Sequence, residues 1–156
     1  DLIINNAGIF NPKPLHLLAP EEFERMMKIN LIAPFFVLRA LLPGWRERGR
    51  GHVITIGSIA DRTIFADNGA YSASKFGIRA MHEVLRAETR GTGVRTTLIS
   101  PSATDTPIWE TVTLAPDNRF PPRDKMLGAD AVADAVVWAA TRPAKVNVDE
   151  LRITAS

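Results

Sequence analysis

Tyr71 and Lys75 lie four residues apart and point most directly to acid–base chemistry. Tyr71 is the only tyrosine in the chain. Residues four positions apart share one face of a helix, so the lysine ammonium can lie beside the phenol. A free phenol has a pKa of about 10 and is a poor acid or base at neutral pH. A neighbouring ammonium favours the phenolate and moves that pKa towards the working range. Taken alone, the pair is better interpreted as a surface contact on a helix.

Ser58 follows a short apolar run, residues 52–56, that is bounded by Gly51 and Gly57. Its hydroxyl can donate a hydrogen bond to the same oxygen atom that the tyrosine protonates. Ligands of open parallel sheets bind at the carboxyl ends of the strands, and Ser58 follows such an end. We therefore expect Ser58, Tyr71 and Lys75 to face one ligand.

The secondary structure predicted around these residues alternates between strand and helix. Apolar runs next to turn residues predict strands at 2–4, 52–56, 94–99 and 150–154. Helical spacing and end signals predict helices at about 20–48, 69–90 and 128–142, the first bent or interrupted near Pro34. This order predicts a parallel sheet with helices on both faces. The segment 101–127, with five prolines and weak periodicity, is predicted to be a lid or binding loop.

Composition excludes several classes of function. The chain has no cysteine, which excludes disulfides and thiolate chemistry, and its net charge of +2 gives little reason to expect nucleic acid. The basic residues of 46–50 fall where a helix should end and complement its dipole. His16, His52 and His82 form no metal-ligand pattern and are interpreted as loop, strand and helix-surface residues.

We also expect no membrane partner. The most apolar run, residues 31–42, is too short to span a bilayer, and the chain does not open with a signal-peptide pattern. A soluble cytoplasmic protein is therefore expected.

Several motifs in the order found here resemble the short-chain dehydrogenase/reductase family over nearly the whole chain. They are Asn5-Asn6-Ala7-Gly8, Lys28-Ile29-Asn30, Ser58, Tyr71-Ser72-Ala73-Ser74-Lys75 and Pro101-Ser102-Ala103-Thr104-Asp105-Thr106. The resemblance implies an α/β fold with a Rossmann-like, doubly wound parallel sheet. It also implies an oxidoreductase that transfers hydride between NADP or NAD and a carbonyl or secondary alcohol.

The resemblance further implies a role for each matching residue. In that family the serine orients the substrate oxygen, the tyrosine transfers the proton, and the lysine binds the nicotinamide ribose and lowers the tyrosine pKa. An asparagine supports a water that relays protons. These roles fall here on Ser58, Tyr71, Lys75 and Asn30.

The implied cofactor-binding residues are Asn6, Ala7, Gly8, Tyr71, Lys75, Pro101, Ser102, Thr104 and Thr106. Ser102 stands where the family usually has glycine, and Thr104 where an aliphatic residue is commoner, so the sequence departs from the family in the segment that should pass the nicotinamide.

The substrate pocket needs an apolar wall, and the nearby apolar residues are candidates for it. They are Ile59, Phe65, Ile108 and Trp109. Core packing is the competing interpretation for these four. Asp61 and Asp67 could line the mouth of the pocket, although acidic loop residues are more often simply solvated.

The sequence departs from the family by having no glycine-rich phosphate loop between a first strand and a helix. We therefore interpret residues 1–156 as a single partial domain that begins at the family's fourth strand and belongs to a longer protein. The region that selects between NAD and NADP is missing, and residues 2–5 should form an exposed apolar edge strand.

Other functions on this fold remain open. One is a non-catalytic scaffold or sensor; another is an epimerase or dehydratase that uses the same Tyr–Lys pair. The complete set of Asn30, Ser58, Tyr71 and Lys75 argues against a scaffold, and no additional acid–base group for the second class is evident. By resemblance, the helices that begin near Glu21 and Gly69 suggest a homodimer or homotetramer.

Overall fold

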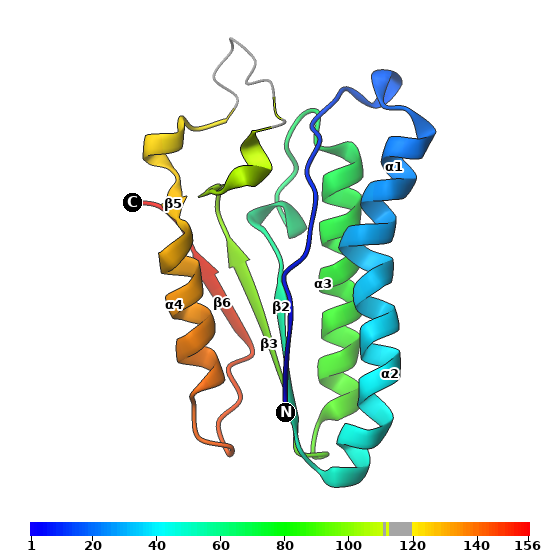
Figure 1. The fold of residues 1–156 in the computed structure, drawn as a ribbon, viewed down its shortest axis with the longest axis vertical. Coiled ribbons are helices and arrows are strands. Elements are labelled where there is room, and N and C mark those ends of the chain that lie inside the picture. The colour runs from blue at the N-terminus through cyan, green and yellow to red at the C-terminus, as the bar shows by residue number, and fades with distance from the viewer. Residues whose placement is uncertain (111, 113–119) are drawn as a thin grey trace.

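The apolar runs form a four-stranded parallel sheet in the order β1-β2-β3-β6 (Figure 1). The strands are β1 (Leu2–Asn5), β2 (Gly51–Ile56), β3 (Val94–Pro101) and β6 (Glu150–Ile153). This is a computed structural model, and it describes residues 1–110, 112 and 120–156. The parallel α/β architecture predicted from the sequence is confirmed.

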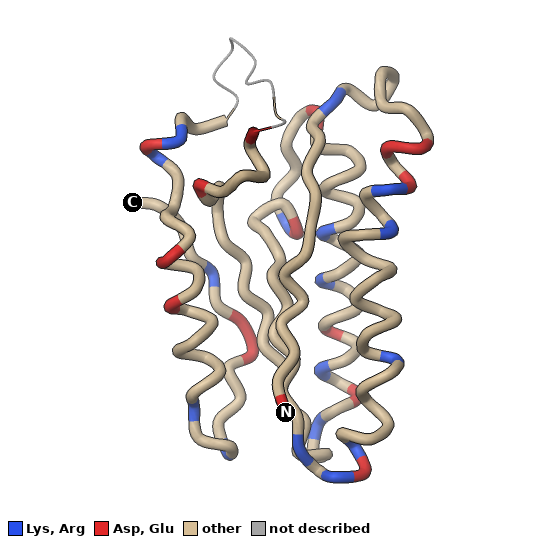
Figure 2. Tube along the Cα trace, in the orientation of Figure 1, with Lys and Arg blue, Asp and Glu red and all other residues tan. Residues whose placement is uncertain are grey.

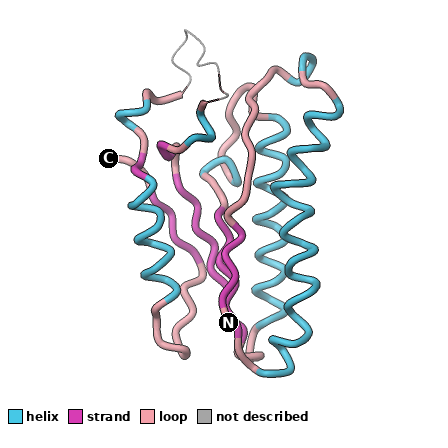
Figure 3. Tube along the Cα trace, in the orientation of Figure 1, coloured by secondary structure: helices cyan, strands magenta, loops and turns pink. Residues whose placement is uncertain are grey.

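Helices cover both faces of the sheet, as Figures 1 and 3 show. On one side lie α1 (Pro20–Met27), α2 (Ala33–Arg48) and α3 (Gly69–Thr89), and on the other lies α4 (Ala129–Ala140). Because successive strand residues point to opposite faces, Val53 packs in the core beneath α2 and α3. Ile54 packs with Ile99 and Ala139 beneath α4.

The edge strand β1 is exposed, as predicted. It pairs only with β2 among the described strands, and the side chains of Leu2 and Ile4 are 48% and 41% exposed. The central strand β2 is buried along most of its length, which suits a strand that has neighbours on both sides.

The predicted interruption of the first helix near Pro34 is confirmed. A π-helical turn, Lys28–Ile32, separates α1 from α2. Pro34 has no backbone N–H and its ring would clash with the carbonyl of Asn30 in a regular helix, so the chain widens there. This turn buries Asn30, which is only 3% exposed.

By length and composition alone, the helical stretch Pro20–Arg48 is sufficient to cross a membrane, a weak indication that core helices of soluble proteins also give. The prediction that no segment spans a membrane rested on the shorter apolar run, residues 31–42. In the structure, one side of the stretch packs on α3 and the core of the sheet.

The C-terminal end of α2 has the charge pattern expected of a helix end. The helix stops at Arg48, and Gly49 takes a left-handed conformation with φ 63°. Figure 2 shows the basic residues of 46–50 gathered at this end. Their positive charge lies against the carbonyl end of the helix dipole.

The segment 101–127 contains more regular structure than the sequence predicted. Two short strands, β4 (Thr104–Asp105) and β5 (Leu127–Gly128), pair in parallel as a second sheet. Two 3-10 turns, Pro107–Trp109 and Arg123–Lys125, flank the part that is not described. Elements of two or three residues are too short to produce a periodic pattern, which explains why the sequence did not reveal them.

Candidate active site

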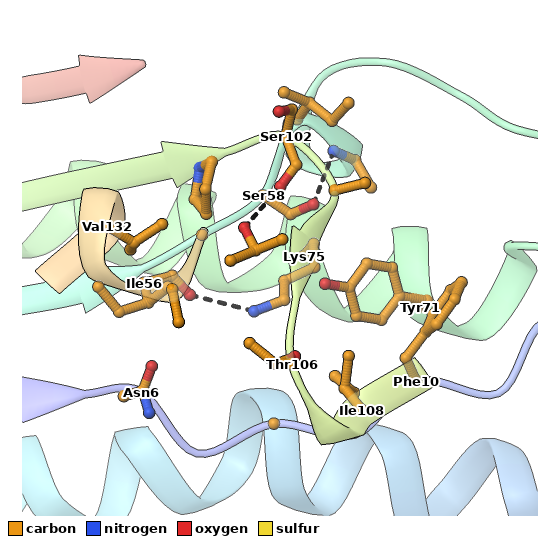
Figure 4. Close-up of a pocket in the computed structure, with 18 of the residues that line it drawn as sticks. Asn6, Phe10, Ile56, Ser58, Tyr71, Lys75, Ser102, Thr106, Ile108 and Val132 are labelled. Atoms are coloured by element: carbon orange, nitrogen blue, oxygen red, sulfur yellow. Dashed lines mark hydrogen bonds between the residues drawn. The ribbon is translucent and has the colours of Figure 1, made fainter. Parts of the chain in front are cut away.

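The carboxyl ends of β1, β2 and β3 border a cavity of about 730 Å³ (Figure 4). Ser58, Tyr71 and Lys75 all line it, so the structure brings together the three residues that the spacing singled out. Ser58 comes from the end of β2, and the other two come from the start of α3. This is the edge of a parallel sheet at which ligands bind.

Lys75 crosses from α3 to the end of β2. Its Nζ donates a hydrogen bond to the carbonyl oxygen of Ile56 at 3.0 Å, drawn as a dashed line in Figure 4. The same Nζ lies 5.6 Å from the centre of the Tyr71 ring. Lys75 is 6% exposed, and burial lowers its pKa to about 8, partly opposed by the charge of Asp61.

The Tyr71 pKa differs from the sequence-based expectation. Burial raises the pKa of the Tyr71 phenol, hydrogen bonding with Ser58 acts in the opposite direction, and the charge of Asp61 raises it further. The net direction is upward, so burial outweighs the lowering that the sequence led us to expect from the Lys75 ammonium. At neutral pH the phenol therefore holds its proton.

Ser58 caps the N-terminal end of a 3-10 turn, Ile59–Asp61. Its Oγ accepts a hydrogen bond from the backbone N–H of Ala60 at 3.1 Å. This contact uses a lone pair of the oxygen, so the hydroxyl proton can be directed at the Tyr71 oxygen or at a ligand in the cavity.

Asn30 connects the segment after β1 to α3. Its Oδ1 accepts from the N–H of Ile9 at 2.8 Å, and its Nδ2 donates to the carbonyl of Ile9 and to Ser74 Oγ, each at 3.0 Å. Ser74 in turn donates to the carbonyl of Tyr71 at 2.7 Å. Asn30 does not line the cavity. Its hydrogen bonds join the segment after β1 to the helix that carries Tyr71, and its proton-relay role stays a prediction.

Most of the expected cofactor residues lie on the cavity wall. Those that line it are Asn6, Gly8, Tyr71, Lys75, Pro101, Ser102, Thr104 and Thr106. Ala7 is not among the lining residues. The Ser102 N–H donates to the carbonyl of Ile153 at 2.8 Å, so the backbone continues alongside β6 with serine at this position.

The donor set fits the nicotinamide end of a dinucleotide. The cavity presents the amide of Asn6, several hydroxyls and one ammonium beside an apolar floor, which suits a ribose and a carboxamide. Among the residues that the structure describes, none forms a glycine-rich phosphate cradle between a strand and a helix.

The apolar wall is aromatic and larger than predicted. All four predicted residues, Ile59, Phe65, Ile108 and Trp109, line the cavity. Sequence reasoning missed Phe10 and Phe120. The ring of Phe10 contacts Tyr71 edge to face with centres 4.7 Å apart and Trp109 at 5.3 Å, and Phe120 lies 5.4 Å from Trp109. Phe10 follows the Asn-Ala-Gly turn by two residues, and that proximity was the available signal.

Two interpretations of single residues are wrong. Asp61 is neither solvated nor at the cavity mouth, since it is 1% exposed and paired with Arg62. His82 is not a surface residue of its helix; it is 2% exposed, and its Nδ1 lies 3.0 Å from Thr55 Oγ1. Both side chains face the sheet, which residue type alone does not reveal. Asp67 does not line the cavity either.

No group of three metal-ligating side chains lies together within the described residues. In that part of the chain the site is built from acid–base, hydroxyl and apolar groups.

The amino-acid sequence is similar to that of several known oxidoreductases. A family model described as short chain dehydrogenase matches residues 1–117. The NADP-dependent 3-hydroxy acid dehydrogenase YdfG of Salmonella typhi is 33% identical over 158 residues, which cover 98% of this chain and 64% of that protein. An uncharacterized oxidoreductase of Staphylococcus epidermidis is 35% identical over 153 residues, with 98% and 64% covered.

Two solved structures of short-chain oxidoreductases and related dehydrogenases have a similar fold. Serine dehydrogenase from Escherichia coli superposes with a TM-score of 0.82 at 33% identity, covering 97% of this chain and 62% of that one. A metagenomic short-chain oxidoreductase in complex with NADP gives 0.75 at 30% identity, covering 100% and 62%. The chain therefore spans less than two thirds of the length of these relatives.

Proposed function

Because this chain belongs to the short-chain dehydrogenase family, we propose that it carries the proton-transfer site of an oxidoreductase that interconverts a carbonyl and a secondary alcohol with NADP or NAD. The observation that supports this most strongly is the convergence of Ser58, Tyr71 and Lys75 on one cavity at the carboxyl ends of β2 and β3. A scaffold would not need a hydroxyl, a phenol and a buried ammonium on the same wall.

The cofactor would occupy the polar side of the cavity. Lys75 would contact its ribose, and Asn6, Ser102 and Thr106 offer the polar groups nearest the strand ends. When bound, the nicotinamide supplies or accepts the hydride. Two relatives are named or solved with NADP, which supports a nicotinamide dinucleotide as the cofactor.

In carbonyl reduction, Ser58 donates a hydrogen bond to the substrate oxygen and Tyr71 transfers its proton to the same atom. The raised pKa of Tyr71 keeps the phenol protonated and ready to act as an acid at neutral pH. Lys75, with its pKa of about 8, is largely protonated there and stabilises the phenolate as it forms.

The substrate would carry an apolar group. Phe10, Trp109 and Phe120 form a continuous aromatic wall that meets the Tyr71 ring. Lys75 is the one charged side chain on the described part of the cavity wall, and it is bonded to Ile56. A ketone or secondary alcohol with an aromatic or branched substituent fits this wall.

We also propose a cytoplasmic homo-oligomer, either a dimer or a tetramer. The outer face of α2 carries Phe35 and Phe36, which are 47% and 60% exposed, and α3 exposes Val84 at 56%. Apolar side chains of this size on neighbouring helices favour burial against a second copy.

The test follows nicotinamide absorbance in the natural full-length protein with NADP or NAD and a panel of ketones and secondary alcohols. Tyr71→Phe keeps the ring and removes the hydroxyl. Turnover should fall by roughly 10²- to 10⁴-fold, whereas the dissociation constant of the cofactor, measured by fluorescence titration, should change little. Full activity of Tyr71→Phe would rule out the mechanism.

A further inference from the structure

A buried carboxylate lies directly behind the candidate site. Asp61 is the last residue of the 3-10 turn that begins after Ser58, and it is 1% exposed. It does not line the cavity. A carboxylate this deeply buried is unfavourable unless it is paired and fully hydrogen-bonded, so its partners define what it does.

Three side chains from different parts of the fold contact the Asp61 carboxylate. Arg62 Nε donates to Oδ1 at 2.7 Å, and Ser100 Oγ on β3 donates to Oδ2 at 2.6 Å. Arg79 on α3 places Nη1 3.7 Å from Oδ1. Glu150, at the start of β6, pairs with Arg62 and lies 3.9 Å from Arg79 Nη2. The carboxylate thus ties the turn to α3 and β3, and its two arginine partners extend the network to β6.

The same carboxylate lies against the backbone that carries Ser58. The Ser58 N–H donates to Asp61 Oδ2 at 3.4 Å. A Cβ built on Gly57 would lie 2.6 Å from that oxygen and 2.9 Å from Ser100 Oγ, so only glycine allows so close an approach without displacing them. The turn from Gly57 to Ser58 is therefore packed directly onto the Asp61–Ser100 contact.

We infer that Asp61 is a positioning residue: its carboxylate, held by Arg62 and Ser100, fixes the Gly57–Ser58 turn and so the direction in which the Ser58 hydroxyl donates. This inference rests on the proposed function, because Ser58 needs a fixed direction only if it binds a reacting oxygen. A hydrogen-bond donor that is already in place needs little free energy to reorganise during the reaction. A small displacement of such a donor reduces the rate strongly.

The charge of Asp61 also reaches the acid–base pair. It raises the pKa of Tyr71 and opposes the lowering of the pKa of Lys75. The charged groups that face Asp61 from the turn, from α3 and from β6 are Arg62, Arg79 and Glu150. Removing the carboxylate should therefore lower the pKa of both Tyr71 and Lys75. The pH dependence of the rate would then shift, which would not happen if Asp61 had a purely structural role.

The test compares Asp61→Asn with the wild type in the natural full-length protein. The amide keeps the shape of the carboxylate and removes its charge. We expect kcat to fall by roughly 10- to 100-fold, with little change in the KM for the cofactor. The pH at which alcohol oxidation reaches half its maximal rate should move to a lower value. Asp134→Asn, at an exposed position of α4, is the matched control and should behave like the wild type.

Ser100→Ala covers the case in which Asp61→Asn does not fold. It removes the donor at 2.6 Å and leaves every charge in place. The variant should lower kcat by roughly threefold to tenfold, because a displaced Ser58 hydroxyl binds the transition state less well. The pH profile should not shift. An unchanged kcat in Ser100→Ala would overturn the inference.

The outcomes separate this inference from the proposed function. If the wild type turns over and Tyr71→Phe does not, but Asp61→Asn loses only thermal stability and keeps its kcat and pH profile, then Asp61 is purely structural and this inference alone fails. If the wild type shows no nicotinamide-dependent turnover, the proposed function fails, and the inference fails with it.

Discussion

The ammonium of Lys75 is bonded to the carbonyl oxygen of Ile56 at 3.0 Å and lies 5.6 Å from the ring centre of Tyr71, one helical turn earlier. The two side chains therefore share a cavity wall without forming a direct ion pair. Lys75 anchors the start of α3 to the end of β2, the strand that leads into Ser58. This arrangement gives the lysine a structural contact as well as an electrostatic effect.

Replacing Lys75 by methionine should separate these two contributions. Lys75→Met keeps the length of the side chain and removes the ammonium, so the phenolate of Tyr71 loses its neighbouring positive charge. Turnover should fall by roughly 10²-fold or more. The free energy of unfolding should change by about 1–2 kcal/mol at most, because the lost hydrogen bond is offset by relief from burying a charge.

Steady-state kinetics and denaturant unfolding of Lys75→Met would check this prediction. Lys145→Met, an exposed lysine near the end of α4, serves as the matched control. Activity of Lys75→Met close to that of the wild type would contradict it.

The two reaction directions should depend on pH in opposite ways. Oxidation of an alcohol needs the Tyr71 phenolate, and because the pKa of Tyr71 is raised, its rate should increase with pH throughout the neutral range. Reduction needs the protonated phenol and should be nearly flat at neutral pH. It should decline above about pH 8, where Lys75 loses its proton because its pKa is about 8. Initial rates across pH 6–10 would test this, and oxidation that does not vary with pH would contradict it.

Phe10 should control affinity for apolar substrates. Its ring packs on both Tyr71 and Trp109, so Phe10→Ala opens the aromatic wall beside the proton donor. The KM for a ketone with an aromatic substituent should rise by about tenfold, since one apolar contact in a pocket contributes about 1–3 kcal/mol. The KM for acetone-sized ketones should change less.

Substrate kinetics over a size series would measure this difference. Phe23→Ala, on α1 and outside the cavity lining, gives the matched control because it removes the same ring elsewhere. An equal change of KM across the series would show that Phe10 does not select for size.

Two buried histidines should make the fold sensitive to acid. Burial lowers the pKa of His52 and that of His82 from 6.5 to about 4. The folded state therefore keeps both rings neutral, whereas the unfolded chain binds protons below about pH 6.5. The stabilising contribution is complete above pH 6.5 and is lost as pH falls towards 4.

Urea unfolding between pH 7 and pH 4 would reveal this dependence, with each unit of pKa difference contributing about 1.4 kcal/mol. His82→Gln should flatten the profile. His16→Gln changes an exposed histidine and should leave the profile unchanged. A wild-type profile that is flat over this window would be inconsistent with neutral buried rings.

The local features of this protein could be predicted from its sequence. Apolar periodicity located every strand of the main sheet and each long helix, and Pro34 marked the interrupted turn. The spacing of Tyr71 and Lys75 placed both on one helix face, and the motifs around them identified the family. These features were predictable because the periodicity of a helix or strand depends on residues that are close together in the sequence.

The contacts between distant segments, and their electrostatic effects, could not be predicted from the sequence and depend on the folded structure. It placed Phe10 against Tyr71, joined Asp61 to Ser100, and directed Lys75 to Ile56. It also set the direction of the Tyr71 pKa, because burial there outweighs the hydrogen bond with Ser58. Such contacts depend on strand order and helix packing, and the burial that governs ionisation is a property of the assembled fold.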